Sequence, residues 1–237
     1  MGFVVAVDGP AGSGKGTITK IVAERLNLTT VDTGAMYRSV ALDCLNKNIK
    51  PTEIEKINEI LKDIQIDLKR ENGKQKVYLN GKDVTEKIRS KEVDDCVAKF
   101  AAIKEIRDKV TPIQRQMGEN QNIIMEGRDI GTVVFPNADV KIFLDCSIEE
   151  RANRRYKQNL EKGITTSYEE VLEGIKERHK LETEREVAPF VKADDAIYVD
   201  STNMNIEEVS EKIIGIIEEK INNLSTRTVP VAKKEKR

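Results

Sequence analysis

The hydrophobic residues of this chain follow two patterns that alternate along its length. Short continuous apolar runs predict buried strands, and stretches with an apolar residue every three or four positions predict amphipathic helices. Five runs of the first kind lie at residues 3–7, 29–31, 122–125, 141–144 and 196–199. Strands that alternate with helices favour an α/β fold built on a parallel sheet.

Residues 52–90 interrupt this alternation. A short helix is predicted over residues 53–62, and three short runs with strand character follow it, at 64–69, 76–79 and 83–84. Asn72-Gly73 and Asn80-Gly81 separate these runs, and Asn-Gly is a strong signal for a tight hairpin turn. We therefore expect a three-stranded antiparallel flap, inserted into the α/β core over about residues 51–87.

The stretch from Ser90 to Met117 predicts two helices. Ser90 is expected to cap the first of them. Pro112 is expected either to interrupt the second helix or to mark its first turn. Arg107 lies on this second helix, and taken by itself it indicates nothing more than a solvated residue.

Residues 151–190 have the pattern of a helical hairpin. Two capping boxes, each a Ser followed three residues later by a Glu, open its helices at Ser147 and Ser167. The second helix is expected to run to about His179. We expect this hairpin to lie over the site as a lid, and we expect His179, in its polar surroundings, to be incidental rather than a core residue or a metal ligand.

The last helix has an apolar stripe that we expect to pack into the core. Its members are Ile206, Val209, Ile213, Ile214, Ile217 and Ile221. Beyond Leu224 the periodicity is lost, so residues 225–237 are expected to form a disordered basic tail.

These patterns predict one domain over residues 1–224, divided into a core, an insertion and a lid. The insertion takes about residues 51–87 and the lid about 151–190. The core is expected to comprise residues 1–50, 88–150 and 191–224.

Composition narrows the classes of partner. The 237 residues contain 40 basic and 41 acidic side chains, for a net charge of −1, which gives no general case for a nucleic acid or a membrane as partner. No apolar span reaches 18 residues, and Asp8 interrupts the first run, so we expect neither a membrane helix nor a signal peptide. Cys44, Cys96 and Cys146 are expected to be reduced core residues of a cytoplasmic protein. The oligomeric state is expected to be monomeric.

The sequence GPAGSGKGT follows the first apolar run and precedes a helical pattern. Strand, glycine-rich loop and helix are the context of a phosphate-binding P-loop, in which backbone N–H groups and a lysine contact the phosphates of a nucleoside triphosphate. A glycine replaces the usual hydroxyl residue after the lysine, and the hydroxyl comes one position later. The residues are Gly9, Pro10, Ala11, Gly12, Ser13, Gly14, Lys15, Gly16 and Thr17.

Further polar residues are candidates for a second phosphate-bearing ligand. Tyr37 and Arg38 lie in the first turn of a predicted helix, where the other reading is an N-cap at Asp32 or Thr33 with a surface arginine. The polar loop over residues 126–132 follows a buried strand and should face the P-loop, because ligands bind at the carboxyl ends of parallel strands.

Three arginines share one face of a predicted helix, at Arg151, Arg154 and Arg155. They are either part of a salt-bridged surface or groups that close over a triphosphate.

Taken together, these motifs resemble those of the bacterial cytidylate kinases, within the nucleoside monophosphate kinases. The resemblance covers about residues 2–222. Besides the P-loop it rests on DTGAMYR (32–38), EGRDIGTVVFP (126–136), KIFLD (141–145) and AP (188–189).

The family resemblance implies a three-layer α/β/α core with a parallel sheet, a monophosphate-binding insertion and a lid. It implies transfer of the γ-phosphoryl group of ATP, with Mg²⁺, to CMP or dCMP. It places the P-loop amides and Lys15 on the ATP phosphates, Arg154 on the ATP side of the lid, and Thr17 near Mg²⁺, in contact through water. The residues expected to bind the monophosphate are Thr33, Tyr37, Arg38, Arg107, Arg128, Asp129, Arg178, Glu182 and Arg185. Of these, Arg128, Arg178 and Arg185, together with Lys15, are the expected catalytic residues.

The chain departs from the family pattern at two places. The lid motif RDxxDxxR is here RHKLETER, with His179 and Glu182 in place of the two aspartates. This leaves open how the lid carboxylate fixes its arginines. Ala98 stands where many members have a serine that contacts cytosine, which leaves the ranking of CMP, dCMP and UMP open.

Other classes of protein fit less well. A kinase acting on UMP, AMP or shikimate is the nearest alternative, although the arginine-rich site favours a phosphorylated acceptor over shikimate. A regulatory GTPase lacks support because Asn46-Lys47 is followed by Asn48-Ile49, without the NKxD guanine signature. A nucleic-acid motor lacks a hydrophobic strand that ends in Asp-Glu, and a binding module would have to work through the basic tail.

Overall fold

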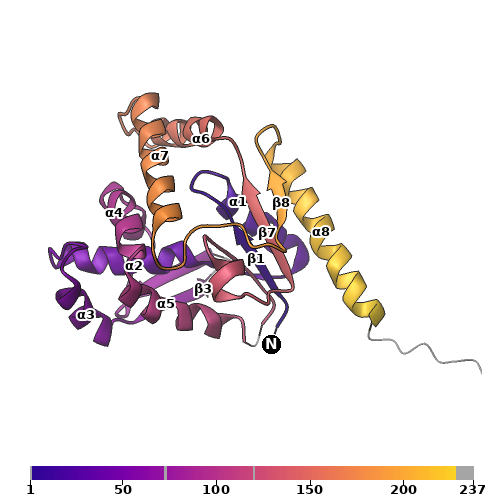
Figure 1. Ribbon diagram of the computed structural model, residues 1–237, viewed down its shortest axis with the longest axis horizontal. Helices are drawn as coiled ribbons and strands as arrows, with labels where there is room; N and C mark the ends of the chain where they lie inside the picture. The colour runs from indigo at the N-terminus through magenta and orange to yellow at the C-terminus, as the bar shows by residue number, and fades with distance from the viewer. Residues whose placement is uncertain (1, 72–73, 120, 228–237) are drawn as a thin grey trace, which may run out of the picture.

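A five-stranded parallel sheet forms the centre of the computed structural model, which describes residues 2–71, 74–119 and 121–227. Its strand order is β2-β6-β1-β7-β8 (Figure 1). The strands are β1 (Val4–Asp8), β2 (Thr29–Asp32), β6 (Ile123–Gly127), β7 (Val140–Asp145) and β8 (Ile197–Asp200). The five apolar runs of the sequence each coincide with one strand, which confirms the predicted parallel α/β sheet.

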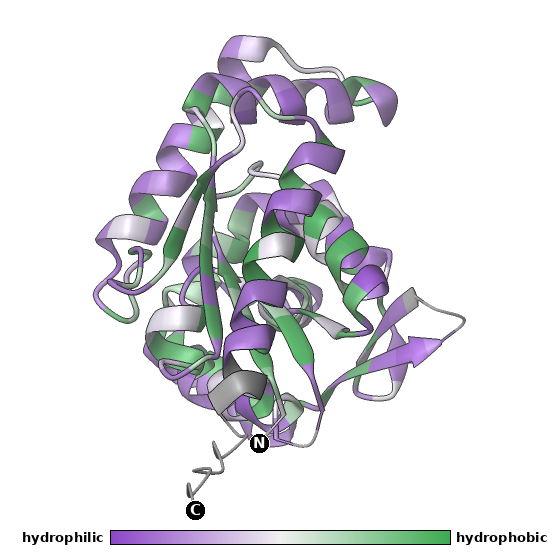
Figure 2. Ribbon diagram, turned by 90° about the vertical axis from the view of Figure 1, so that its right-hand side faces the viewer, coloured by the Kyte–Doolittle hydropathy of each residue, from purple (hydrophilic) through white to green (hydrophobic). Residues whose placement is uncertain are grey.

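Alternate residues of the central strand enter two different cores. Val4 and Ala6 pack with α2 (Thr33–Asn46) and α5 (Lys104–Met117) on one face of the sheet. Val5 and Val7 pack with α1 (Lys15–Leu26) and α8 (Ile206–Arg227) on the other. A strand buried on both faces must be apolar throughout, which is the reason β1 reads as a continuous run. The result is three α/β/α layers, with apolar strands between helices whose outer faces are polar (Figure 2).

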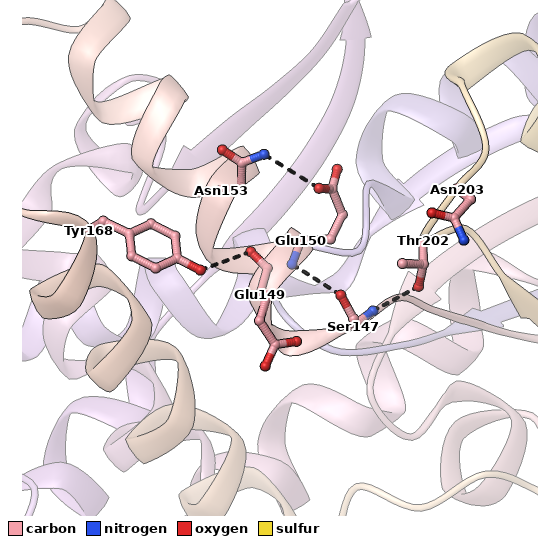
Figure 3. A pocket seen from close by; sticks show the side chains of 7 residues that line it. All are labelled: Ser147, Glu149, Glu150, Asn153, Tyr168, Thr202 and Asn203. Carbon is pink, nitrogen blue, oxygen red and sulfur yellow. Dashed lines mark hydrogen bonds between the residues drawn. The ribbon is translucent and has the colours of Figure 1, made fainter.

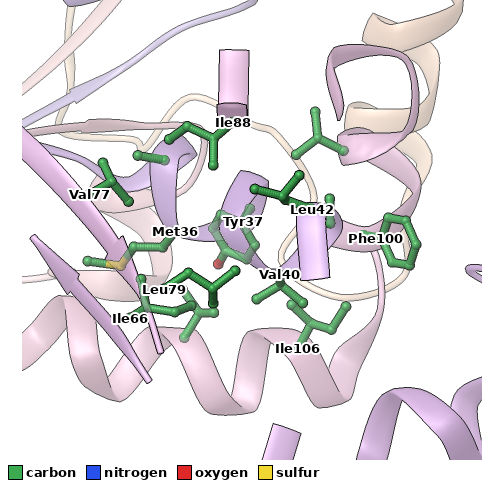
Figure 4. Packing of buried hydrophobic residues seen from close by; sticks show 14 of the residues in the cluster. Met36, Tyr37, Val40, Leu42, Ile66, Val77, Leu79, Ile88, Phe100 and Ile106 are labelled. Atoms are coloured by element: carbon green, nitrogen blue, oxygen red, sulfur yellow. The ribbon is translucent and has the colours of Figure 1, made fainter. Parts of the chain in front are cut away.

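The insertion extends the core on the α2 side. It consists of α3 (Ile54–Asp63), the antiparallel strands β3 (Ile66–Glu71), β4 (Lys74–Leu79) and β5 (Lys82–Asp83), and a 3₁₀ turn over Lys87–Arg89. Ile66, Val77 and Leu79 pack around Met36 of α2 (Figure 4), so the flap is anchored by its apolar face. This confirms the predicted flap.

One of the two Asn-Gly pairs of the flap forms a tight hairpin turn. Asn80 and Gly81 both have positive φ, at 48° and 77°, as a two-residue hairpin turn of type I′ requires. Asn72-Gly73 lies outside the described residues.

The lid is a hairpin of α6 (Ile148–Glu161) and α7 (Tyr168–Glu184), which projects from the sheet above α4 (Lys91–Ala101) in Figure 1. A small apolar cluster of its own, including Ala152, Val171 and Ile175, joins the two helices. Ser167 makes the predicted capping box with Glu170. Ser147 makes only half of one. Its hydroxyl accepts from the N–H of Glu150, but its own N–H donates to Thr202, so Glu150 pairs with Arg154 instead.

α2 begins at Thr33, and the Asp32 side chain accepts from the N–H of Ala35, which confirms the reading of an N-cap at Asp32. The predicted end of the second lid helix was wrong. α7 runs five residues beyond His179, to Glu184, because Glu182 is buried there against two arginines.

Pro112 neither interrupts nor opens α5 but lies inside it. The helix continues because the buried side chains of Ile106 and Val110 hold it against the core on that side. A five-residue π-helix over Ile130–Val134, which no pattern predicted, follows β6.

The last helix also differs from its prediction. α8 extends to Arg227, so the division at Leu224 was wrong, and residues 228–237 of the predicted tail lie outside the described residues. Ile206 and Ile221, at the two ends of the stripe, are 54% and 37% exposed, because the helix projects past the sheet there. Within the described ranges, no helix has the length and apolarity needed to cross a membrane.

Candidate active site

The P-loop connects β1 to α1 as the sequence predicts. Gly12 and Gly14 have φ of 84° and 89°, in the left-handed region that a side chain makes costly, and Gly14 caps the helix. Lys15 is buried in the loop, and its Nζ donates to the carbonyl of Pro10 at 2.8 Å and to Ser13 Oγ at 3.3 Å. Burial and the nearby Arg128 lower the pKa of Lys15. The anionic phosphates of a nucleotide would stabilise its charge and oppose this shift.

Asp8, at the carboxyl end of β1, fixes the loop that follows β6. Its carboxylate accepts hydrogen bonds from the N–H groups of Ile130 and Gly131, both at 2.8 Å. Burial raises the pKa of Asp8 to about 6, against the opposing effect of these two hydrogen bonds. Asp8 is therefore a positioning group for the polar loop rather than a group that reaches the ligand.

Glu126 places a carboxylate directly beside the P-loop. A Cβ built on Gly16 would lie 3.2 Å from Glu126 Oε1, so a larger residue at position 16 would crowd the carboxylate. Within the described parts of the chain, no hydrogen bond or ion pair reaches this side-chain carboxylate, and burial together with Asp32 raises its pKa. The expectation that residues 126–132 face the P-loop is confirmed. Glu126 itself was missed as a site residue, although its place at the end of a buried strand is a signal that identifies such groups.

Arg107, Asp129 and Arg185, three of the residues expected to bind the monophosphate, form a buried ionic cluster. Arg107 Nη2 donates to Asp129 Oδ2, and Arg185 Nη2 lies 3.7 Å from Asp129 Oδ1. The Arg107 side chain is 3% exposed, so reading it from sequence as a solvated residue was wrong. It lies over the ring of Tyr37, 5.2 Å from the centroid, and its Nη1 donates to the carbonyl of Ala101. One carboxylate thus holds two arginines at a fixed spacing.

The start of α2 contributes two of the expected acceptor residues. Thr33 Oγ1 donates to the carbonyl of Glu126 at 2.7 Å, which ties α2 to β6. Arg38 Nη2 donates to Asp94 Oδ1 at 3.0 Å. In the described structure, Arg38 Nε, Tyr37 OH and both amide atoms of Gln114 are buried without a hydrogen-bond partner. Buried donors without partners are rare, so the acceptor side has polar capacity that a ligand can satisfy.

Glu182 joins the lid to the loop after β6. Its Oε2 accepts from Arg128 Nε at 2.8 Å and its Oε1 from Arg178 Nε at 3.0 Å. Burial alone would raise the pKa of Glu182, but Arg128 and Arg178 outweigh it and lower the pKa to about 2. The departure from aspartate at this position therefore still leaves a carboxylate between the arginines. His179 points to Phe190, with ring centroids 5.9 Å apart.

The three arginines of α6 do not act as one group. Arg151 packs against Gly12 of the P-loop, and Arg155 pairs with Asp94. Of the three side chains, Arg154 is the one that donates hydrogen bonds to the P-loop and to the loop after β8 in the described structure. Arg154 Nη1 donates to the Ser13 carbonyl at 3.3 Å, and its Nη2 to the Ser201 carbonyl at 2.9 Å. The three arginines are therefore neither a salt-bridged surface nor a single group that could close over a triphosphate.

A shallow hollow of about 420 Å³ lies beside Arg154, between the start of α6 and the loop after β8 (Figure 3). Glu149 and Glu150 contribute two carboxylates to its wall. It therefore lacks the positive charge that a phosphate group needs. Its lining residues are Ser147, Glu149, Glu150, Asn153, Tyr168, Thr202 and Asn203.

Sequence comparisons identify the family. The family model described as cytidylate kinase matches residues 5–219. The chain belongs to the cytidylate kinase family. The cytidylate kinase of Bacillus subtilis (strain 168) is 47% identical over 216 residues, which cover 91% of this chain and 96% of the relative. That of Fusobacterium nucleatum subsp. nucleatum is 48% identical over 222 residues, 94% of this chain and 98% of the relative. Family membership overturns the GTPase, motor and binding-module alternatives.

Solved structures give a weaker likeness. A shikimate kinase from Acinetobacter baumannii is 14% identical, with 92% of this chain and 94% of that chain covered and a TM-score of 0.47. The parallel α/β/α fold of this cytidylate kinase family member is shown by its own five-stranded sheet and the helices packed on both faces.

The structure brings several of the predicted residues together. Lys15 interacts electrostatically with Arg128 and Glu182, and Glu182 also binds Arg178, so the P-loop lysine lies close to the junction of the lid with the loop after β6. Thr17 is exposed at the start of α1. Among the described residues, its hydroxyl makes no hydrogen bond to the P-loop or to the arginines. Besides Glu126, sequence reasoning missed Asp94, which has no motif around it.

Proposed function

We propose that this chain transfers the γ-phosphoryl group of ATP to CMP or dCMP, giving ADP and CDP or dCDP. Membership of the cytidylate kinase family supports this reaction. The observation that carries it is the set of arginines opposite the P-loop. Arg38, Arg107, Arg128, Arg178 and Arg185 come from α2, α5, the loop after β6 and the end of the lid, and each pairs with Asp94, Asp129 or Glu182. Arg128 is close enough to Lys15 to lower the pKa of that lysine.

The chemistry needs positions and charge rather than a nucleophilic side chain. The phosphate of a nucleoside monophosphate has its second pKa near 6, so at neutral pH its oxygen attacks without losing a proton. A bond forms between that oxygen and the γ-phosphorus, and the bond from the γ-phosphorus to the β–γ bridging oxygen breaks. The protein aligns the two anions and stabilises the charge spread over the transferring group.

We assign the donor side to backbone and the acceptor side to arginines. The N–H groups of the P-loop and Lys15 would bind the β- and γ-phosphates of ATP, and Arg154 would lie along the donor from the lid. Arg38 and Arg128 would bind the acceptor phosphate, and Arg178 and Arg185 would complete the site from the lid.

Other residues of the acceptor side would contact the base and the rest of the acceptor nucleotide. Arg107 and Asp129 would read the pyrimidine, next to the free donors of Tyr37 and Gln114. Thr33 would contact the acceptor nucleotide from the start of α2, and Glu182 would hold Arg128 and Arg178 in place.

The residues present fit a magnesium ion. The Glu126 carboxylate, which lies beside Gly16, and the exposed Thr17 hydroxyl are oxygen groups of the kind that Mg²⁺ prefers, with water molecules completing its shell. When bound with ATP, Mg²⁺ supplies positive charge to the phosphates. Glu126 and Thr17 would hold its water shell on the donor side. Glu126→Gln should weaken the Mg²⁺-dependent part of the affinity for a fluorescent ATP analogue and leave the Mg²⁺-free part unchanged.

The reaction is tested by ADP release with ATP and each of CMP, dCMP, UMP, AMP and GMP. We expect turnover with CMP and dCMP to exceed that with the others. A preference for a purine monophosphate would overturn the assignment, and a preference for UMP would support the nearest alternative within the same kinase class.

We place the reaction in the cytoplasm and expect a monomer. Cys44, Cys96 and Cys146 are free thiols, as is usual in reducing compartments, although Cys96 is only half-buried. Sedimentation at the assay concentration tests whether the protein is a monomer.

A further inference from the structure

One carboxylate outside the family motifs lies between the lid and the acceptor side. Asp94 is on α4, and its side chain is 15% exposed. Its Oδ1 accepts from Arg38 Nη2 at 3.0 Å and lies 3.9 Å from Arg178 Nη1. Its Oδ2 accepts from Arg155 Nη2. These arginines belong to α2, α7 and α6, so a single side chain links α4 to both lid helices and to the start of the acceptor site.

The arginines around Asp94 keep positive charge and N–H groups with which they can bind a further anion. Burial disfavours its ionised form, but Arg38, Arg155 and Arg178 outweigh that effect and hold the pKa of Asp94 at about 2. One negative charge therefore faces three positive ones at neutral pH. Each guanidinium uses one nitrogen on Asp94 and has five N–H groups in all. Arg38 Nε is buried without a partner in the described structure, which leaves a donor for an anion.

We propose that Asp94 is a positioning residue for phosphoryl transfer, which draws Arg155 and Arg178 of the lid onto Arg38 of the acceptor side. The proposal rests on the proposed function. Asp94 acts through the arginines and does not touch the substrate. By binding both lid helices, it favours the closed lid, in which Arg178 reaches the acceptor phosphate together with Arg38. Pre-arranged charges of this kind stabilise a transition state without reorganisation during the reaction.

A different role for the same contacts is competition. A carboxylate that occupied the phosphate position would have to leave before CMP could bind, and removing it would tighten CMP binding. The geometry favours positioning, because Glu182 already occupies Nε of Arg178 while Asp94 approaches only Nη1. The two carboxylates thus fix the guanidinium from two sides.

The first experiment compares Asp94→Asn with Asp95→Asn. Asp95 is the next residue of the same helix, has the same charge and is exposed, so it controls for the change in net charge. We expect Asp94→Asn to lower kcat about tenfold, with KM for CMP changed less than about twofold, because the lid arginines act mainly on the transition state. Asp95→Asn should match the unmodified enzyme, and Asp94→Glu should recover part of kcat.

The second experiment is a double-mutant cycle with Arg155→Gln, a residue to which we assign no substrate contact. If Asp94 works through Arg155, each single variant and the double variant should all lose about tenfold in kcat/KM. An additive loss of about a hundredfold in the double variant would overturn the coupling. Tighter CMP binding in Asp94→Asn would overturn positioning in favour of competition.

A third measurement needs no activity. Hydrogen exchange of ligand-free protein should show faster exchange in the last turns of α7 in Asp94→Asn than in Asp95→Asn. Equal exchange in the two variants would contradict the proposal even if CMP proved not to be the substrate. Conversely, unmodified enzyme that does not phosphorylate CMP would overturn the proposed function and leave this structural test standing.

Discussion

The two sides that we propose for ATP and for the nucleoside monophosphate, the donor side and the acceptor side, are built in different ways. The donor side consists mainly of the backbone of nine consecutive residues that run from the end of β1 into the first turn of α1, with two glycines at positive φ and one buried lysine. The acceptor side consists of side chains from at least five elements, held in place by Asp94, Asp129 and Glu182. The first arrangement depends on local conformation, and the second depends on the tertiary fold and on the position of the lid.

This difference determines how each side responds to substitution. Side-chain substitution does not remove a backbone N–H group, so on the donor side it acts mainly through Lys15, the one charged side chain within the P-loop. On the acceptor side, several arginines share one carboxylate. When one arginine is removed, the carboxylate still binds another arginine and holds it in place. We therefore expect substitutions on the donor side to have larger effects than those on the acceptor side.

Lys15→Ala is expected to have the largest effect. It removes the one side-chain charge within the P-loop while the loop backbone stays in place, and comparable losses of a preorganised charge lower kcat by about a thousandfold. Steady-state kinetics with ATP and CMP measure it, and circular dichroism checks the fold. Turnover within tenfold of the unmodified enzyme would contradict the donor assignment.

Arg185→Ala is expected to lower kcat/KM about a hundredfold, less than the loss at Lys15. The side chain is 5% exposed and lies by Asp129, which keeps Arg107 as a partner when Arg185 is removed. Arg185→Lys is the matched variant, and it should recover only part of the loss because an ammonium group cannot reproduce the guanidinium fork. Equal rates for the alanine variant and the unmodified enzyme would show that Arg185 has no role on the acceptor side.

Glu182→Gln tests the carboxylate clusters through stability. The folded pKa of Glu182 is lowered from 4.5 to about 2. Its contribution to stability is therefore complete above the unfolded pKa and is lost as the pH falls from about 5 towards 2. A shift of this size corresponds to about 3 kcal/mol of unfolding free energy at pH 7. Urea unfolding at pH 7 and pH 3 should show the difference between the variant and the unmodified protein shrinking at the lower pH.

The neighbouring Glu184→Gln is the control for that measurement, because Glu184 is on the same helix and is exposed. It should give nearly the same unfolding free energy as the unmodified protein at both pH values. A Glu182 variant with a pH-independent difference would show that the arginines do not hold the folded pKa low.

The sequence predicted the sheet, the flap, the P-loop and the lid because each has a local signal. Apolar runs identify β1 and β6, Asn80-Gly81 identifies a hairpin, and Ser167 identifies the start of α7. Family motifs brought most of the acceptor residues into the prediction. The parts that failed are those decided by tertiary contacts, such as the end of α7, which is fixed where Glu182 is buried between arginines.

Asp94 shows why the rest of the site could not be predicted. In the sequence it is one of two adjacent acidic residues on an amphipathic helix, and nothing local separates it from Asp95. Only the folded chain brings α2, α6 and α7 to one of them. Arg107 differs from Asp94 because the family resemblance did place it in the site. Its burial, however, could not be predicted locally, since it depends on Asp129, 22 positions away.

Ala98→Ser is expected to have the smallest effect and to refine the comparison within the acceptor side. Ala98 is half-buried on α4, four residues after Asp94, so the two lie on the same face of the helix, toward Arg38. A hydroxyl added there could hydrogen-bond the base, and we expect the ratio of kcat/KM for CMP over UMP to rise about threefold to tenfold, as one added hydrogen bond allows. Ala138→Ser, at a half-buried alanine before β7, should leave the ratio unchanged. Equal ratios in both variants would show that base selection lies with Arg107 and Asp129 alone.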